Sequence, residues 1–306
     1  MHRSASARLP MTVFFFGALV VPLVGRGEDV HYDVFVTSDG TGLVLGGYDD
    51  AATTATVPSD QMRVFGGEVV PSGTSPAPYE SASPGEPGFR ASTQAFLNNP
   101  SLTTPAGVYT ALPGSTPLTF SFLPLTIGAA TRNLFYWGGS GTVAFAPAAN
   151  DVAVTLTKQG GGGWSAGITG TSAGIVAGNT IQTTSSGASV GTIHTHLFTS
   201  IDKGGLVPDE GFYLFSLQLA MTGLQSSESA YFVFGALDPD AMTPQQLVDF
   251  ETAHGLAEAW VETNLAAVPE PATGLVALLA ASGVGVFITR RRRRNGGFAP
   301  SADPAG

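Results

Sequence analysis

Two histidines separated by one residue give the clearest chemical signal in the sequence. His194 and His196 lie in the alternating run 190–198, and this alternation predicts a β-strand. Successive side chains of a strand point to opposite faces, so both imidazoles would leave the same face, about 7 Å apart along the strand. Two rings at that spacing can converge on one metal ion. Ile193 and Leu197 would anchor the opposite face in the core.

A second pair of candidate ligands, His31 and Asp33, lies in the first predicted strand. The same spacing puts an imidazole and a carboxylate on one face. Two strands that each offer two ligands could complete a tetrahedral site of nitrogen and oxygen atoms. The chain has no cysteine, which excludes thiol chemistry and cysteine-based metal sites. The alternative is that these are polar side chains on a solvated face. His254 is expected to be a hydrogen-bonded core residue rather than a ligand.

The elements that would position these ligands are mainly β-strands. Short alternating runs recur between turn residues, and no helical crossovers separate them. We therefore expect an all-β fold, an antiparallel β-sandwich or jelly-roll-like barrel. A long loop is predicted over 71–87 and a glycine turn over 160–163. The predicted strands are 32–37, 42–47, 118–124, 142–146, 152–157, 174–183, 190–198, 212–220 and 230–234.

One amphipathic helix is predicted after the last strand. Thr243 suits the N-cap and Pro244 the first helical position. An apolar stripe at helical spacing follows and is expected to pack on the sheet. Its members are Leu247, Phe250, His254, Ala257, Val261 and Leu265.

Both ends of the chain have the features of export and sorting segments. Residues 1–27 combine a basic leader, an apolar run and small residues, which predicts a secretory signal peptide. At the other end, an apolar run over 272–289 is long enough to cross a ~30 Å hydrocarbon core as a transmembrane helix. Arginines after this run would hold its end on the cytoplasmic side; they are Arg290, Arg291, Arg292, Arg293 and Arg294.

A Pro-Glu-Pro tripeptide, formed by Pro269, Glu270 and Pro271, precedes the apolar run. The tripeptide, the single hydrophobic span and the basic cluster together resemble the PEP-CTERM sorting signal of exported bacterial proteins. The resemblance implies an exosortase-type sorting enzyme as partner. It also implies a membrane-anchored precursor whose product reaches the cell surface or the extracellular space. The expected organisation is a signal peptide over 1–27, an exported domain over 28–267, the sorting signal over 268–295 and a cytoplasmic tail over 296–306.

The predicted exported domain is acidic. Between His31 and Ala266 there are five basic residues and 19 acidic ones. Nucleic acids and anionic membrane surfaces bind clustered lysine and arginine, so this balance argues against either as a partner. It suits a soluble surface protein that attracts cations.

The domain also resembles a particular group of PEP-CTERM proteins, exported by cyanobacteria and planctomycetes and controlled by the zinc-uptake repressor. The matching segments, in order, are His31-Tyr32-Asp33-Val34, Arg63-Val64-Phe65-Gly66-Gly67-Glu68, Glu86-Pro87-Gly88-Phe89, His194-Thr195-His196-Leu197, Glu210-Gly211-Phe212-Tyr213-Leu214-Phe215-Ser216-Leu217-Gln218-Leu219 and Ser229-Ala230-Tyr231-Phe232-Val233-Phe234. The resemblance implies a link to zinc supply but no established activity. It adds Glu68 and Glu86 as carboxylate candidates.

Three classes of function follow from these features. The first is an exported protein that binds a divalent metal, zinc, through its histidines. The second is a non-enzymatic exopolysaccharide-matrix or adhesion module, in which Tyr136, Trp137 and Trp164 could stack on sugars. The third is a cupin-like metalloenzyme. The sequence has no His-Glu-x-x-His or Gly-x-Ser-x-Gly motif, so no catalytic residue is assigned. A metal site predicts that His31 and Asp33 approach His194 and His196 within a few ångströms. An adhesion module predicts that these residues lie far apart and that an aromatic strip is exposed. An enzyme predicts a concave pocket beside the histidines with a further acid or base group.

Overall fold

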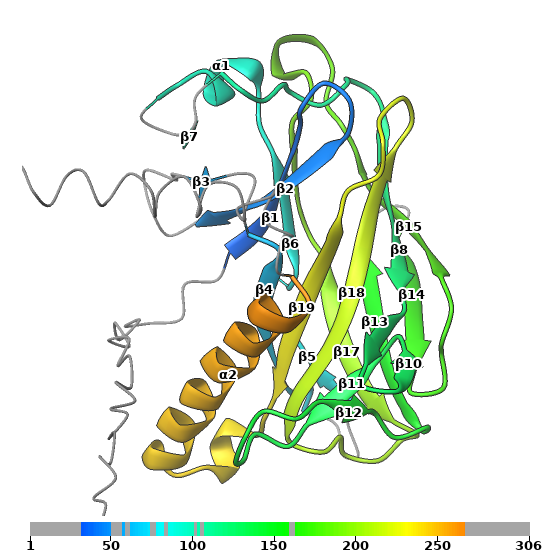
Figure 1. Ribbon diagram of the computed structural model, residues 1–306, viewed down its shortest axis with the longest axis vertical. Coiled ribbons are helices and arrows are strands. Elements are labelled where there is room, and N and C mark those ends of the chain that lie inside the picture. Colours follow the sequence, from blue (N-terminus) through cyan, green and yellow to red (C-terminus); the bar gives the residue numbers. More distant parts are fainter. Residues whose placement is uncertain are drawn as a thin grey trace, which may run out of the picture. The chain divides into compact units, whose positions relative to one another are not determined.

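The computed structural model describes residues 32–49, 57–58, 62–73, 78–82, 85–100, 103–104, 107–158 and 163–266. Most regular structure in these residues is β-strand, which confirms the predicted all-β class (Figure 1). His31, the signal peptide, the Pro-Glu-Pro tripeptide, the transmembrane run, the arginine cluster and the tail all lie outside the described residues. Those assignments remain predictions. None of the helices in the described part of the chain is long and apolar enough to span a membrane.

The smaller of the two main sheets carries the predicted metal ligands. Its strands are β1 (Tyr32–Ser38), β2 (Leu43–Asp49), β6 (Gly88–Ala91) and β16 (Ile193–His196), in the order β16-β6-β1-β2. β6 is antiparallel to β16 and parallel to β1. Alternation along β6 sends Phe89 and Ala91 into the core, and Gly88 and Arg90 to the opposite face. That opposite face also carries Asp33, His194 and His196.

The larger sheet has the order β12-β11-β18-β19-β4-β5-β17-β13-β14, with β8 paired to β18 and β15 paired to β8. β18 is buried on both faces along most of its length. Two short strand pairs lie outside the main sheets, β9 (Leu125–Ile127) with β10 (Ala130–Arg132) and β3 (Val57–Pro58) with β7 (Thr103–Thr104). The larger sheet's strands are β4 (Val64–Pro71), β5 (Tyr79–Glu80), β8 (Pro117–Leu123), β11 (Phe135–Trp137), β12 (Ala146–Pro147), β13 (Val152–Lys158), β14 (Trp164–Thr169), β15 (Val176–Thr183), β17 (Phe198–Lys203), β18 (Gly211–Met221) and β19 (Ser229–Ala236).

The main hydrophobic core lies between the two sheets, as in a sandwich. Val34 and Phe89 from the smaller sheet belong to the same buried cluster as Phe215 and Phe232 from the larger one. Removal of this apolar surface from water is the principal force that holds the two sheets together. A smaller cluster around Phe35 lies on the other face of the smaller sheet, against the short helix α1 (Gln94–Leu97).

The predicted helix is confirmed as α2 (Pro244–Asn264), which follows the short 3₁₀ turn η2 (Pro239–Ala241). Thr243 caps it in a capping box with Gln246, and Pro244 occupies the first turn. Figure 1 shows α2 running beside β19, and the strands that it contacts include β4, β19 and β18. Ala257 and Val261 of its apolar stripe pack with residues of these strands in a second buried cluster.

The strand predictions need four corrections. Residues 142–146 form no strand except for Ala146 in β12, since Val143 and Phe145 pack into the cluster beneath α2 without pairing. The run 190–198 contains β16 and the start of β17, which belong to different sheets and separate at Leu197. A 3₁₀ turn, η1 (Gly187–Ser189), precedes β16.

The predicted loop over 71–87 includes the short strand β5. The purely antiparallel arrangement is corrected to a mixed one, because β1–β6, β4–β19 and β3–β7 are parallel pairs. Parallel neighbours need long connections that alternation alone does not reveal. The glycine run 160–163 does separate two antiparallel partners, β13 and β14, although residues 159–162 are not described.

Candidate metal centre

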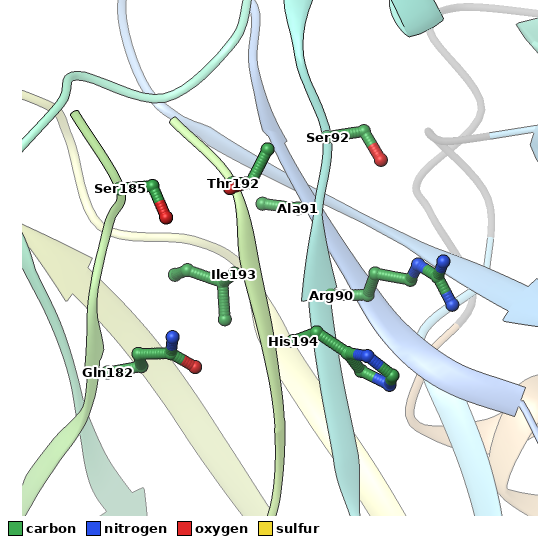
Figure 2. Close-up of a pocket in the computed structure, with 8 residues that line it drawn as sticks. All are labelled: Arg90, Ala91, Ser92, Gln182, Ser185, Thr192, Ile193 and His194. Atoms are coloured by element: carbon green, nitrogen blue, oxygen red, sulfur yellow. The ribbon is translucent and has the colours of Figure 1, made fainter. Parts of the chain in front are cut away.

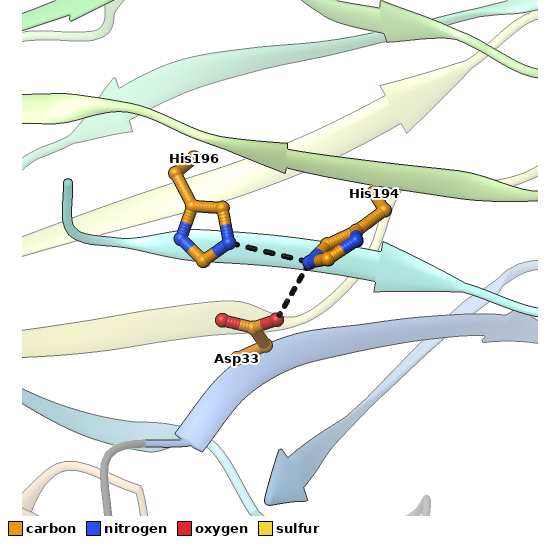
Figure 3. A group of neighbouring side chains, drawn as sticks. All are labelled: Asp33, His194 and His196. Atoms are coloured by element: carbon orange, nitrogen blue, oxygen red, sulfur yellow. Dashed lines mark hydrogen bonds and ion pairs between the residues drawn. The ribbon is translucent and has the colours of Figure 1, made fainter. Parts of the chain in front are cut away.

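A carboxylate and two imidazoles converge on the face of the smaller sheet that points away from the main core. One ligand atom from each of Asp33, His194 and His196 lies within 4.8 Å of the others. The two histidine Nε2 atoms are 3.3 Å apart, and His194 Nε2 is 3.9 Å from Asp33 Oδ2 (Figure 3). The predicted approach of Asp33 to the histidine pair is therefore confirmed, and the three side chains form a candidate metal centre.

The separation of the two imidazoles matches one edge of a tetrahedral zinc site. Zinc–nitrogen bonds of about 2.0–2.1 Å place two ligands of a tetrahedron roughly 3.3–3.4 Å apart. The observed Nε2–Nε2 distance of 3.3 Å lies at this value. The 3.9 Å separation of His194 Nε2 from Asp33 Oδ2 is about half an ångström longer.

Gly88 allows the carboxylate to reach the histidines. In the sheet register His196 is paired with Gly88 on β6, and Val34 on the other side of β6 is paired with Phe89. Asp33, Gly88 and His196 therefore lie in one row across three strands. A Cβ at position 88 would overlap the Asp33 carboxylate and lie 3.0 Å from Cε1 of His196. The absence of a side chain at Gly88 opens the space through which Asp33 extends.

A backbone carbonyl determines which ring nitrogen of His196 carries the proton. Its Nδ1 lies 3.0 Å from Gly85 O, which can only accept a hydrogen bond, so Nδ1 carries the proton and donates. In the neutral ring Nε2 then has its lone pair available for a metal, on the side of His194 and Asp33. Hydrogen bonds from Leu197 N to Pro87 O at 3.0 Å and from Thr199 Oγ1 to Glu86 O at 2.7 Å hold this segment against the strand.

The centre is protected on one side and open on the other. The Asp33 side chain is 9% exposed, whereas that of His194 is 53% exposed. Without a metal, a proton on His194 Nε2 can donate to His196 Nε2. A divalent cation would bind the lone pair of His194 Nε2, with the ring proton on Nδ1 instead. The negative charge of the protected carboxylate favours a cation at this position.

The other candidate ligands are not part of this group. Glu86 accepts a hydrogen bond from the backbone N–H of Glu68 at 3.0 Å, and neither residue belongs to the ligand cluster found in the described part of the chain. His254 is buried, donates from Nε2 to Val233 O at 2.9 Å and stacks on Phe212. The prediction that His254 is a hydrogen-bonded core residue is confirmed.

The aromatic residues considered for sugar binding serve the interior instead. Trp137 is buried and stacks on Phe212. Trp164 packs against the main core and donates its Nε1–H to Thr180 O at 2.8 Å. Tyr136 is half-buried and donates to Glu210 O at 2.5 Å. These three side chains form no exposed aromatic strip.

A cavity of about 360 Å³ adjoins the centre at His194. It lies where the edge strand β16 runs beside the end of β15, and Figure 2 shows Arg90 and His194 projecting to the same side. The lining residues are Arg90, Ala91, Ser92, Gln182, Ser185, Thr192, Ile193 and His194.

Three contributors to this region were not predicted as site residues. They are Gly85, which orients His196, Gly88, which makes room for Asp33, and Arg90, which faces His194. The alternation of residues 88–91 could indicate a short strand, but the sequence does not show that this strand lies between β1 and β16.

No protein-family model, curated protein or solved structure matches the chain significantly. The geometry of the metal centre is therefore the main guide to function.

Proposed function

We propose that this chain is an exported cell-surface or extracellular protein, sorted through its Pro-Glu-Pro signal, that binds a divalent metal at Asp33, His194 and His196. The main support is the geometry of the three side chains: the Nε2 atoms of His194 and His196 are 3.3 Å apart, and the largely buried carboxylate of Asp33 lies beside them. The hydrogen bond from His196 Nδ1 to the Gly85 carbonyl also supports the proposal. Metal-binding histidines typically use the N–H of their second ring nitrogen to donate a hydrogen bond to a carbonyl or carboxylate.

Zinc is the metal that this ligand set favours. Imidazole and carboxylate are common zinc ligands, and the histidine spacing suits a tetrahedral ion. The resemblance to proteins under zinc-uptake control points the same way. The role that follows is a zinc scavenger or store outside the cytoplasm, with no catalytic residue assigned. His31, two residues before Asp33, stays a predicted fourth ligand.

The test is zinc content and zinc titration of the purified full-length chain. We expect one zinc per chain and loss of that zinc in the His194→Ala/His196→Ala variant. Thr155→Ala/Thr157→Ala is a matched control, because it changes two residues at the same spacing on another strand, β13. Absence of zinc binding in the parent chain, or binding that survives the histidine substitutions, would overturn the proposal.

The other two functions have less support. For an exopolysaccharide-matrix or adhesion module, the two tryptophans considered for sugar stacking, Trp137 and Trp164, are packed inward. A cupin-like metalloenzyme would need an acid or base group beside the metal, and no carboxylate is among the residues lining the cavity at His194. The jelly-roll-like form of the sandwich also stays a prediction, and the parallel pairs weaken it.

A further inference from the structure

Asp33 and Arg90 extend in opposite directions on one face of the smaller sheet. The strand order β16-β6-β1-β2 places β6 and β1 side by side in the middle of this sheet. Asp33, on β1, reaches across β6 at Gly88 towards the histidines of β16 (Figure 3). Arg90, on β6, reaches across β1, and its Cζ lies 3.8 Å from the centre of the ring of Tyr48, a residue of β2. The two oppositely charged side chains therefore end over different strands.

Arg90 starts close enough to Asp33 to compete with a metal for its carboxylate. The register pairs Arg90 with Phe35, which lies two residues after Asp33 and on the same face. Diagonal neighbours of this kind are roughly 7–8 Å apart, a distance that a long side chain spans. Arginine binds carboxylates through two parallel charge-assisted hydrogen bonds. A guanidinium turned towards the Asp33 carboxylate would therefore occupy the oxygen atoms that a metal ion needs.

Tyr48 gives the guanidinium a fixed aromatic surface. Its ring stacks on that of Phe35, with the centroids 5.8 Å apart, and contacts Phe96 of α1 at 6.3 Å. These rings belong to the cluster on the outer face of the smaller sheet, so packing holds the Tyr48 ring in place. A cation within about 6 Å of a ring centroid is attracted to the negative face of the ring. The contact therefore favours one position of Arg90, with its charged end over the Tyr48 ring.

The position of this positive charge also affects the energy of a cation at the triad. Arg90 is the direct partner of His194 across the β6–β16 pair, so its side chain begins beside the metal centre. A guanidinium beside the histidines would repel a divalent ion, and the repulsion falls as the distance between the charges grows. Neighbouring strands are about 4.8 Å apart, and two strands separate β2 from β16. Holding the guanidinium at Tyr48 therefore weakens the repulsion.

We propose that Tyr48 is a positioning residue for metal binding: its ring holds the Arg90 guanidinium away from the triad, so that the Asp33 carboxylate stays available to a metal ion bound by His194 and His196. This inference rests on the proposed metal-binding function and deepens it, because it names a residue that controls the charged ligand. Tyr48 is not itself a ligand and acts through Arg90. The aromatic ring, rather than the hydroxyl group, has this role.

The experiment is a double-mutant cycle on the zinc affinity of the full-length chain. Tyr48→Leu removes the ring and should raise the dissociation constant for zinc severalfold, with a limit of roughly 30-fold set by the strength of a cation–π contact. Tyr48→Phe keeps the ring and should bind zinc as the parent chain does. Arg90→Gln should bind zinc at least as tightly as the parent chain. In the Arg90→Gln background, Tyr48→Leu should have no further effect on zinc affinity.

The outcomes separate this inference from the function on which it rests. If the parent chain binds no zinc, the metal-binding function fails and the inference fails with it. If the parent chain binds zinc through its histidines but Tyr48→Leu binds it equally well, the function stands and the role of Tyr48 is overturned. An undiminished loss in the Arg90→Gln background also overturns it, because the ring would then act through packing alone. Should Tyr48→Leu not fold, Arg90→Gln decides: weaker zinc binding in that variant would mean that the guanidinium assists the metal, contrary to the inference.

Discussion

Replacement of Gly88 by alanine tests the geometry of the metal centre without altering any ligand. Gly88 lies between Asp33 and His196, and a methyl group there would occupy the position of the Asp33 carboxylate. The backbone of β6 accepts alanine, because Gly88 is not among the glycines with positive φ. The effect would therefore come from the displaced carboxylate rather than from a strained main chain.

The size of the effect follows from the crowding. Overpacking a well-packed site costs about 1–3 kcal/mol, and each kcal/mol lowers the melting temperature of a chain this size by about 2–4 °C. The Asp33 side chain, only 9% exposed, has little room to move without leaving the histidines. Zinc affinity should fall at least about tenfold, since disturbing even the supporting groups of a metal site typically costs about 10–100-fold.

Zinc titration and thermal unfolding of Gly88→Ala would measure both effects. Gly255→Ala is the matched control, because Gly255 lies in α2 with open space around its Cβ position, and alanine should stabilise the helix there by about 0.5–1 kcal/mol. In an Asp33→Ala background the penalty of Gly88→Ala should largely disappear. Wild-type zinc affinity in Gly88→Ala would refute the inference that Asp33 reaches the metal across Gly88.

Three further predictions concern metal removal, alkaline pH and the helix cap. Zinc at a hundredfold excess over its dissociation constant should stabilise the chain by about 2.7 kcal/mol, measured by thermal unfolding with and without chelator; a shift that persists in His194→Ala/His196→Ala would contradict the assigned ligands. Burial, then the charges of Tyr136 and Asp209, raise the pKa of Tyr213 above its ordinary value of 10.0. The folded state therefore gains stability from the neutral phenol of Tyr213; this contribution is complete below pH 10.0 and is lost as the pH rises above that value. Tyr213→Phe should flatten the alkaline decline of the unfolding free energy in denaturant titrations. An unchanged decline would exclude Tyr213 as the cause of that decline. Thr243→Ala removes the cap of α2 and should cost about 1 kcal/mol in urea unfolding, with no change in zinc affinity.

Local patterns were sufficient for the features that depend on a single element. The shared face of His194 and His196 follows from the two-residue period of a strand, and the structure brings their Nε2 atoms together. The start of α2 follows from Thr243 and Pro244, whose capping role depends only on the first turn. The burial of His254 likewise follows from its place on the apolar stripe.

Pairing between distant segments was not readable from the sequence. The run 190–198 looks like one strand, yet the chain changes sheets at Leu197, because β16 pairs with β6 while β17 pairs with β5 and β13. Glu68 and Glu86 were carboxylate candidates because they lie inside the matching motifs, but the Glu86 side chain accepts a hydrogen bond from the backbone N–H of Glu68 on β4.

The sequence by itself determined a mostly β domain, a histidine pair on one strand face, and a carboxylate on another strand that could join it. The tertiary structure decided that Asp33 does join the pair, because the parallel pairing of β1 with β6 sets its row and Gly88 leaves the space. It also decided that Arg90 stands opposite His194 beside a cavity. Alternation fixes the face on which a side chain emerges, whereas strand register fixes its neighbours, and register depends on contacts between segments far apart in the chain.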